Sequence, residues 1–106
     1  MAFNFIEISP SQEVPIIEKL VFTAQIKTNV TYALCTNPTS QPIELNIYVG
    51  ENIDLLAPIL TKKVIANYDT YLCNELKGMI LNENESLYIK GSLGGLWFRA
   101  NGFTFN

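Results

Sequence analysis

Residues 28–49 carry the pattern that most constrains how this chain can fold. An apolar-rich segment at 28–36 precedes a polar turn with two prolines at 37–42, and a second apolar-rich segment follows at 43–49. In that second segment apolar and polar side chains alternate, which is the period of a strand with one buried face. The side chains expected on the buried face are Ile43, Leu45, Ile47 and Val49. We predict a β-hairpin here and expect it to start the core.

Turn signals divide the rest of the chain into short segments of strand composition. The further strands that we expect cover residues 3–8, 20–24, 59–65, 70–76, 86–91 and 96–105, with a short apolar segment at 79–81. The last of them is either a strand pair or one strand with a bulge at Asn101-Gly102. About eight short strands at this spacing favour a β-sandwich or barrel over a parallel α/β fold.

Several details of these segments are testable against a structure. Ser9-Pro10-Ser11 should end the first strand, and Pro15 should place residues 14–17 at an edge or a bend, with a short helix over 15–20 as the alternative. We expect Leu93-Gly94-Gly95 to be a hairpin tip. In the strand at 70–76, alternation places Tyr71, Cys73 and Glu75 on one face and Leu72, Asn74 and Leu76 on the other.

Length and composition predict one all-β domain. The chain has 106 residues, of which 48% are hydrophobic, so a single antiparallel β-sandwich over residues 1–106 can bury a core without metals or disulfides. Charged residues make up only 16%, so Asn, Thr, Ser and Gln must build the polar surface. A weakly charged surface of this kind favours a chain with neighbours in an assembly. Residues 1–19 are expected to be an assembly-contact arm or an edge strand.

Charge and hydropathy argue against two classes of partner. The net charge is −3 and the basic residues are scattered, with only Lys62-Lys63 adjacent, so we expect no binding to nucleic acid. No stretch approaches the ~20 apolar residues that cross a bilayer, so we expect no membrane partner. The residues after Met1 lack the basic and apolar regions of a signal peptide, which predicts synthesis in a cytoplasm.

The residue types present offer little catalytic chemistry. The chain has no histidine, which excludes Ser-His-Asp and Cys-His catalysis and histidine metal sites. Cys35 and Cys73 are expected to be buried free thiols; a disulfide would need their Cα atoms within about 7 Å. We expect no enzyme activity, no cofactor and no metal. The turn with Glu83 and Glu85 is expected to be solvated, with a calcium site as the alternative.

Exposed aromatic side chains are the candidates for contacts with a partner. The interface candidates that we single out are Phe3, Phe5, Tyr68, Tyr71, Trp97 and Phe98. For most aromatic residues, a place in the core is the competing interpretation. An aromatic platform on an exposed sheet face would instead favour a carbohydrate-binding or host-adhesion module, which burial of Tyr68, Tyr71 and Trp97 together would exclude.

From residue 20 to residue 106 the order of these segments follows a recurring pattern. Two strands joined by an Asn-containing turn come first, then an apolar strand, a short strand ending in Leu, a unit of Leu, polar turn and Leu, and a Gly-containing last strand. These features occupy residues 30–37 and 43–49, 60–65, 70–76, 81–87 and 100–106. In this order the chain resembles a group of small virion proteins of tailed bacteriophages. Its relatives often carry Gly-Asp where this chain has Asn84-Glu85.

The resemblance implies a β-sandwich of jelly-roll type that acts as a structural part of a virus particle. It brings no catalytic residues. It implies that the chain packs against major capsid, neck or tail proteins, with several copies forming a homo-oligomer in the particle. Capsid decoration is the first expectation for its position, and the neck or tail is the second.

Overall fold

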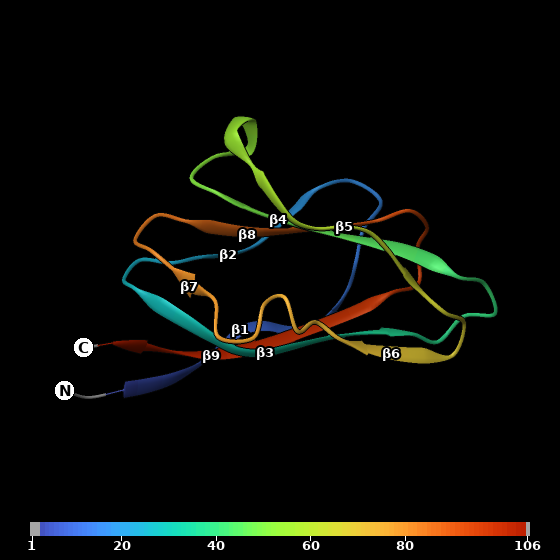
Figure 1. Ribbon diagram of the computed structural model, residues 1–106, viewed down its shortest axis with the longest axis horizontal. Coiled ribbons are helices and arrows are strands. Elements are labelled where there is room, and N and C mark those ends of the chain that lie inside the picture. The colour runs from blue at the N-terminus through green and yellow to red at the C-terminus, as the bar shows by residue number, and fades with distance from the viewer. Residues whose placement is uncertain (1–2, 106) are drawn as a thin grey trace.

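The computed structural model describes residues 3–105 and consists of two antiparallel sheets that face each other (Figure 1). One sheet has the order β1 (Phe3–Glu13), β9 (Trp97–Phe105), β3 (Thr28–Asn37) and β6 (Asp69–Leu72), with β7 (Ile80–Leu81) also pairing with β3. The other has the order β2 (Lys19–Thr23), β8 (Ser86–Gly91), β4 (Ile43–Gly50) and β5 (Ala57–Ile65). A 3₁₀ turn, η1 (Ile53–Leu55), precedes β5. The predicted antiparallel β-sandwich is confirmed.

The strand order is that of a jelly roll. Except for β4 and β5, the neighbours within each sheet come from distant parts of the chain, because most connections cross from one sheet to the other. Consecutive strands therefore occupy corresponding positions in the two sheets: β1 and β2, β9 and β8, β3 and β4, and β6 and β5. Two such sheets of nested strands define the jelly roll.

The core lies between the two sheets. The alternation predicted for β4 is confirmed, since Ile43, Leu45, Ile47 and Val49 are all buried. From β8, Leu87 and Ile89 join them, and the facing sheet contributes Phe98 and Ala100. These side chains exclude water from a single apolar layer, and burial of this kind is the main source of stability in such a fold.

The predicted hairpin at 28–49 is wrong, although both of its strands are present. β3 pairs with β9, β6 and β7, whereas β4 pairs with β8 and β5 in the other sheet. The turn crosses between the sheets because Asn37 is fully buried there, and its side-chain amide donates to the carbonyl oxygens of Gln41 (2.7 Å) and Ile65 (3.0 Å). The hairpin tip predicted at residues 93–95 is wrong for a related reason, since that turn joins β8 to β9 across the sheets.

Two predicted strand ends also differ from the structure. β1 continues through Ser9-Pro10-Ser11, because an edge strand tolerates proline and two register shifts interrupt its pairing there. The predicted strand at 70–76 ends at Leu72, because the chain then turns, with Leu76 N–H donating to the Cys73 carbonyl (2.9 Å). Cys73 and Leu76 are therefore both buried, which contradicts the predicted division of faces.

The last strand is continuous. β9 runs from Trp97 to Phe105, and the register shifts on either side of Asn101 lie in its two neighbours, β3 and β1. Of the two alternatives for residues 96–105, one strand with a bulge is thus confirmed over a strand pair. The extra residues of the bulges lie in β3 and β1 and not in β9. Residues 14–18 form no helix; Val14 N–H donates instead to the Leu96 carbonyl (2.8 Å).

Candidate interaction surface

The sheet formed by β1, β9, β3 and β6 has one face packed against the core and one face exposed to solvent. Along β9, Phe98 and Ala100 are buried while Trp97 and Arg99 are exposed, so alternate residues point away from the core. We call this surface the outer face. Its apolar residues are Phe3, Phe5, Leu34, Leu72, Trp97, Phe103 and Phe105.

An aromatic cluster occupies one end of the outer face. It consists of Phe3 and Phe5 of β1 and Phe103 and Phe105 of β9, which lie opposite each other in the ladder. The rings meet edge to face, with centroids 5.2 Å apart for Phe3 and Phe103 and 5.3 Å apart for Phe103 and Phe105. Phe5 nevertheless leaves 86% of its surface exposed, and Phe3 leaves 54%. Exposure of apolar rings to water is unfavourable, and a partner that covered them would lower the free energy.

One cation lies beside the aromatic cluster. The Lys27 Nζ atom is 5.6 Å from the centroid of the Phe105 ring, close enough for a cation–π contact. Lys27 is held there because its carbonyl accepts a hydrogen bond from Phe105 N–H (3.4 Å) just before β3 begins. The aromatic end of the outer face thus carries a positive charge beside an apolar patch.

The opposite end of the outer face carries Trp97 and Leu72. Trp97 lies opposite Thr36 in β9–β3 pairing, and Thr36 lies opposite Thr70 in β3–β6 pairing, so these three residues form one row. Leu72 follows on β6 and is 59% exposed, while Trp97 is 44% exposed. The outer face therefore offers large apolar side chains at both ends, separated by the polar and charged middle of the sheet.

The six predicted interface residues do not share one environment. Phe98 was wrongly included, because it is fully buried and is the largest buried side chain. Phe3, Phe5 and Trp97 lie on the outer face, as described above. The prediction missed Phe103 and Phe105, although their alternation matches that of Phe3 and Phe5 and was visible in the sequence.

Tyr71 and Tyr68 lie away from the outer face. Tyr71 packs against the core, with its hydroxyl donating to the Glu75 carboxylate (2.6 Å) and with Lys63 Nζ 4.8 Å from its ring centroid. Burial, followed by the hydrogen bond to Glu75, raises the pKa of Tyr71 to about 12. Tyr68 is 70% exposed in the turn before β6. Trp97 and Tyr71 point to opposite faces of the sheet, so they do not make a common platform.

The two cysteines are buried free thiols, as predicted. Burial, with a smaller contribution from Cys73, raises the pKa of Cys35 to about 12. Burial, with a smaller contribution from Glu75, raises the pKa of Cys73 to about 12. Because the thiolate is the nucleophilic form, both groups are unreactive near neutral pH.

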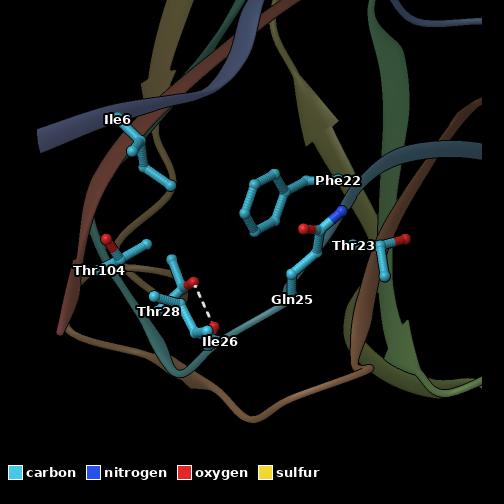
Figure 2. Close-up of a pocket in the computed structure, with 7 residues that line it drawn as sticks. All are labelled: Ile6, Phe22, Thr23, Gln25, Ile26, Thr28 and Thr104. Atoms are coloured by element: carbon cyan, nitrogen blue, oxygen red, sulfur yellow. Dashed lines mark hydrogen bonds between the residues drawn. The ribbon is translucent and has the colours of Figure 1, made fainter. Parts of the chain in front are cut away.

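A pocket of about 280 Å³ opens at the end of the sandwich near the aromatic cluster. Figure 2 shows Ile6 of β1 and Phe22 of β2 pointing into it from the two sheets. The other lining residues are Thr23, Gln25, Ile26, Thr28 and Thr104. The Thr28 hydroxyl donates to the Ile26 carbonyl (2.9 Å), so this polar group already has a partner. The lining has no ionisable side chain.

The acidic turn between β7 and β8 is closed by one of its own carboxylates. Glu85 Oε1 accepts a hydrogen bond from Asn82 N–H (2.7 Å), and Asn84 adopts a positive φ of 74°. Within residues 3–105, no group of three or more His, Cys, Asp or Glu side chains could hold a metal ion. Nor does any helix in this range have the length and apolar character to cross a membrane.

Comparisons with known proteins bear on the fold. No protein-family model and no curated protein matches the sequence. One solved structure, described as the infectious bursal disease virus Gt strain, contains a similar chain, with a TM-score of 0.52 and 11% identity. The alignment covers 96% of this chain and 32% of that one, so this chain spans about a third of its length. At this identity the likeness concerns the fold alone, and it agrees with the β-sandwich.

Proposed function

We propose that this protein is a non-enzymatic structural component of a virus particle, held in place by protein–protein contacts. The observation that carries the proposal is the outer face, where Phe5, Leu72 and Trp97 expose apolar surface on one side of the sheet. Monomeric soluble proteins rarely leave such surface uncovered, and partner proteins are its usual cover.

The size of the outer face suits this role. Three strands of about ten residues and a fourth of four residues, about 4.8 Å apart at 3.3 Å per residue, give a face of roughly 540 Å². A standard interface buries about 800 Å² on each partner, and side chains add area beyond the plane of the sheet. The outer face is therefore large enough for one specific contact.

The fold gives independent support. Jelly rolls build many viral capsid domains, and the similar chain comes from the structure of a virus. The resemblance to small virion proteins of tailed bacteriophages favours capsid decoration first and a neck or tail position second. Its partners are then the major capsid, neck or tail proteins, and its location is the virion.

The chemistry of the buried groups agrees with a structural role. Cys35 and Cys73 are the strongest nucleophiles among the residue types present, and their raised pKa values keep them as neutral thiols. They serve the fold as small apolar side chains.

Binding to particles that lack the protein tests the proposal. The unmodified chain should sediment with such particles, and Trp97→Ser or Leu72→Ser should reduce the bound fraction by about tenfold, since each removes an apolar contact at a buried interface. Leu55→Ser is the matched control, because Leu55 is 71% exposed in η1, outside the sheet that forms the outer face.

The outcomes separate cleanly. Binding that the control retains and the outer-face variants lose supports the proposal. Absence of binding, together with absence of the protein from purified particles by mass spectrometry, contradicts it. Binding of host glycans by a chain that ignores virion proteins would favour the adhesion module instead.

A further inference from the structure

The sandwich has four sheet edges, and three of them are protected against pairing with another chain. β5 carries Pro58, two lysines, a positive φ of 51° at Lys62 and two register shifts. β2 has five residues and a register shift, and β6 has only four residues. Proline, lysine, bulges and short length are the usual devices that prevent edge-to-edge association.

The first half of β1 lacks all of these devices. Residues 3–7 pair with β9 without a register shift, contain no proline and carry one charge, at Glu7. The first shift comes immediately afterwards, between Glu7 and Ser9, and Pro10 follows. Figure 1 shows this part of β1 running beside the end of β9, clear of the other sheet. An open, flat edge with exposed aromatic residues is a template for a further strand.

The geometry points to a second copy of this chain as the occupant of that edge. Residues 3–7 of β1 would pair antiparallel with residues 3–7 of the second copy, which joins the two sheets into one. The inference rests on the proposed function, because it names the partner for the aromatic end of the outer face. A two-fold axis makes such an edge complementary to itself.

The limits of the flat segment determine the register. Pairing all five residues with their symmetry mates centres the axis on Phe5. Phe5 then lies opposite Phe5 of the second copy, and Phe3 lies opposite Glu7 of the second copy. The side chains at positions 3, 5 and 7 share the outer face, so the two aromatic clusters meet there.

Charge complementarity supports the same register. Glu7 of the second copy would lie one strand beyond Phe3, and Phe3 packs on Phe105, whose ring lies beside Lys27. The main-chain positions of Glu7 and Lys27 then lie three strand spacings apart, ~14 Å, and the Lys27 side chain, which reaches to the Phe105 ring, brings its charge toward the Debye length of about 10 Å at 0.1 M salt. Lys90 and Glu18 form the only ion pair within residues 3–105, so neither Glu7 nor Lys27 has a charged partner among these residues. The symmetry makes this attraction occur twice.

The area available predicts a weak dimer. Phe3 and Phe5 expose 54% and 86% of their surfaces, or together about 280 Å² if each ring residue offers about 200 Å². Both copies together would cover about 560 Å² of these side chains, plus the main-chain edge. This lies below the ~1,200 Å² at which standard interfaces begin and in the range of weak, transient ones, so we expect dissociation constants of about 10–100 µM.

Sedimentation equilibrium of the full chain tests the dimer. The unmodified protein should pass from monomer to dimer across this range, and Phe5→Ser should raise the dissociation constant at least about tenfold. Phe5 is so exposed that the variant should keep its fold, which circular dichroism can verify. Leu55→Ser, at an apolar site elsewhere that is also mostly exposed, should leave the constant unchanged.

A charge exchange tests the register. Glu7→Lys and Lys27→Glu should each weaken the dimer about three- to tenfold, and the double variant should restore it to within about twofold. Oxidation of Phe5→Cys should give a disulfide-linked dimer, whereas Leu55→Cys should not, because only position 5 faces its own copy across about 5 Å. A chain that stays monomeric at 1 mM, or a dimer indifferent to Phe5→Ser and to the charge exchange, would overturn the inference.

The two proposals fail separately. Particle binding without a dimer leaves the structural role in place and removes the β1 pairing. A dimer that responds to the substitutions as predicted, in a protein that does not bind particles, supports the β1 pairing and removes the structural role.

Discussion

Asn37 is the single residue on which the crossover from β3 to β4 most depends. Its side chain is fully buried, its amide donates to the carbonyls of Gln41 and Ile65, and its Oδ1 atom accepts from Thr39 N–H (3.0 Å) and Thr39 Oγ1–H (2.7 Å). Three of these partners are main-chain groups of the turn and of β5. Asn37 therefore fixes the turn and ties it to the opposite sheet.

Replacement of Asn37 should be costly. Asn37→Ala removes the side-chain donor to the buried Ile65 carbonyl and the acceptor that holds Thr39, so we expect the free energy of unfolding to fall by about 2–3 kcal/mol. Urea denaturation measures it. Asn67→Ala is the control; Asn67 is exposed in the turn before β6, and its replacement should change stability by less than about 0.5 kcal/mol. Equal effects at the two positions would contradict the role of Asn37.

Gly102 is required by a close approach of backbones. A Cβ atom there would overlap the Asn29 carbonyl oxygen and lie 2.6 Å from Ile8 Cδ1. Gly102→Ala should destabilise the protein by about 2–3 kcal/mol, because the bulged neighbours cannot move apart without loss of pairing. Gly94→Ala should be nearly neutral, since its Cβ would come no closer than 3.5 Å, to Glu13 Oε2. Thermal denaturation of both variants makes the comparison, and a neutral Gly102→Ala would refute it.

The buried thiols predict a loss of stability at high pH. Cys35 and Cys73 have pKa values raised from 9.0 to about 12, so the unfolded chain gives up these protons first as the pH rises. Their contribution is complete below pH 9 and is lost progressively between pH 9 and 12. The pKa of Tyr71, raised from 10.0 to about 12, adds to this loss of stability above pH 10.

Urea midpoints at pH 7, 9 and 11 measure this effect. The midpoint should fall between pH 9 and 11, and the double variant Cys35→Ala and Cys73→Ala should lose less over the same interval, whatever its stability at pH 7. An equal decline in both proteins would show that other groups cause it.

At the scale of the elements, local pattern predicted the strands but not which strands pair. The alternation in β4 identified its buried face correctly, because burial depends on period alone. Pairing depends on where each turn leads, and both turns predicted as hairpins cross between sheets. Asn37 looks like an ordinary turn residue in the sequence, and only its burial shows that it directs the crossover.

Strand pairing is directly testable by NMR. Amide-to-amide contacts should connect β4 with β8 around Ile47 and Ile89, and β3 with β9 around Cys35 and Phe98. A hairpin closed by Asn37 and Ile43 would instead place Leu34 opposite Asn46. Contacts between those two residues would contradict the jelly-roll topology.

The candidate surface was only partly predictable for a similar reason. Phe3 and Phe5 were recognised as interface residues, whereas Phe98 was misassigned because Trp97 and Phe98 are adjacent and sequence alone does not decide which of them faces the core. The alternation of side chains along β9 places Phe98 toward the core, and this alternation is fixed by the pairing of β9 with both β1 and β3.

At the scale of the whole molecule, the fold is a small jelly roll whose outer face exposes aromatic side chains. Composition predicted this class of fold, because a 106-residue chain with 48% hydrophobic and 16% charged residues can bury a core yet has few charges for its surface. It did not locate the outer face, because that surface combines residues from both ends of the chain, such as Phe3 and Phe105.

The most direct test of the proposed structural role is a cryo-electron microscopy reconstruction of the virus particle that we propose contains this chain. We predict density for the jelly roll on the particle, with the outer face, and Phe5 and Trp97 in particular, buried against neighbouring protein. A particle without this density, or one in which the outer face points into solvent, would contradict the account.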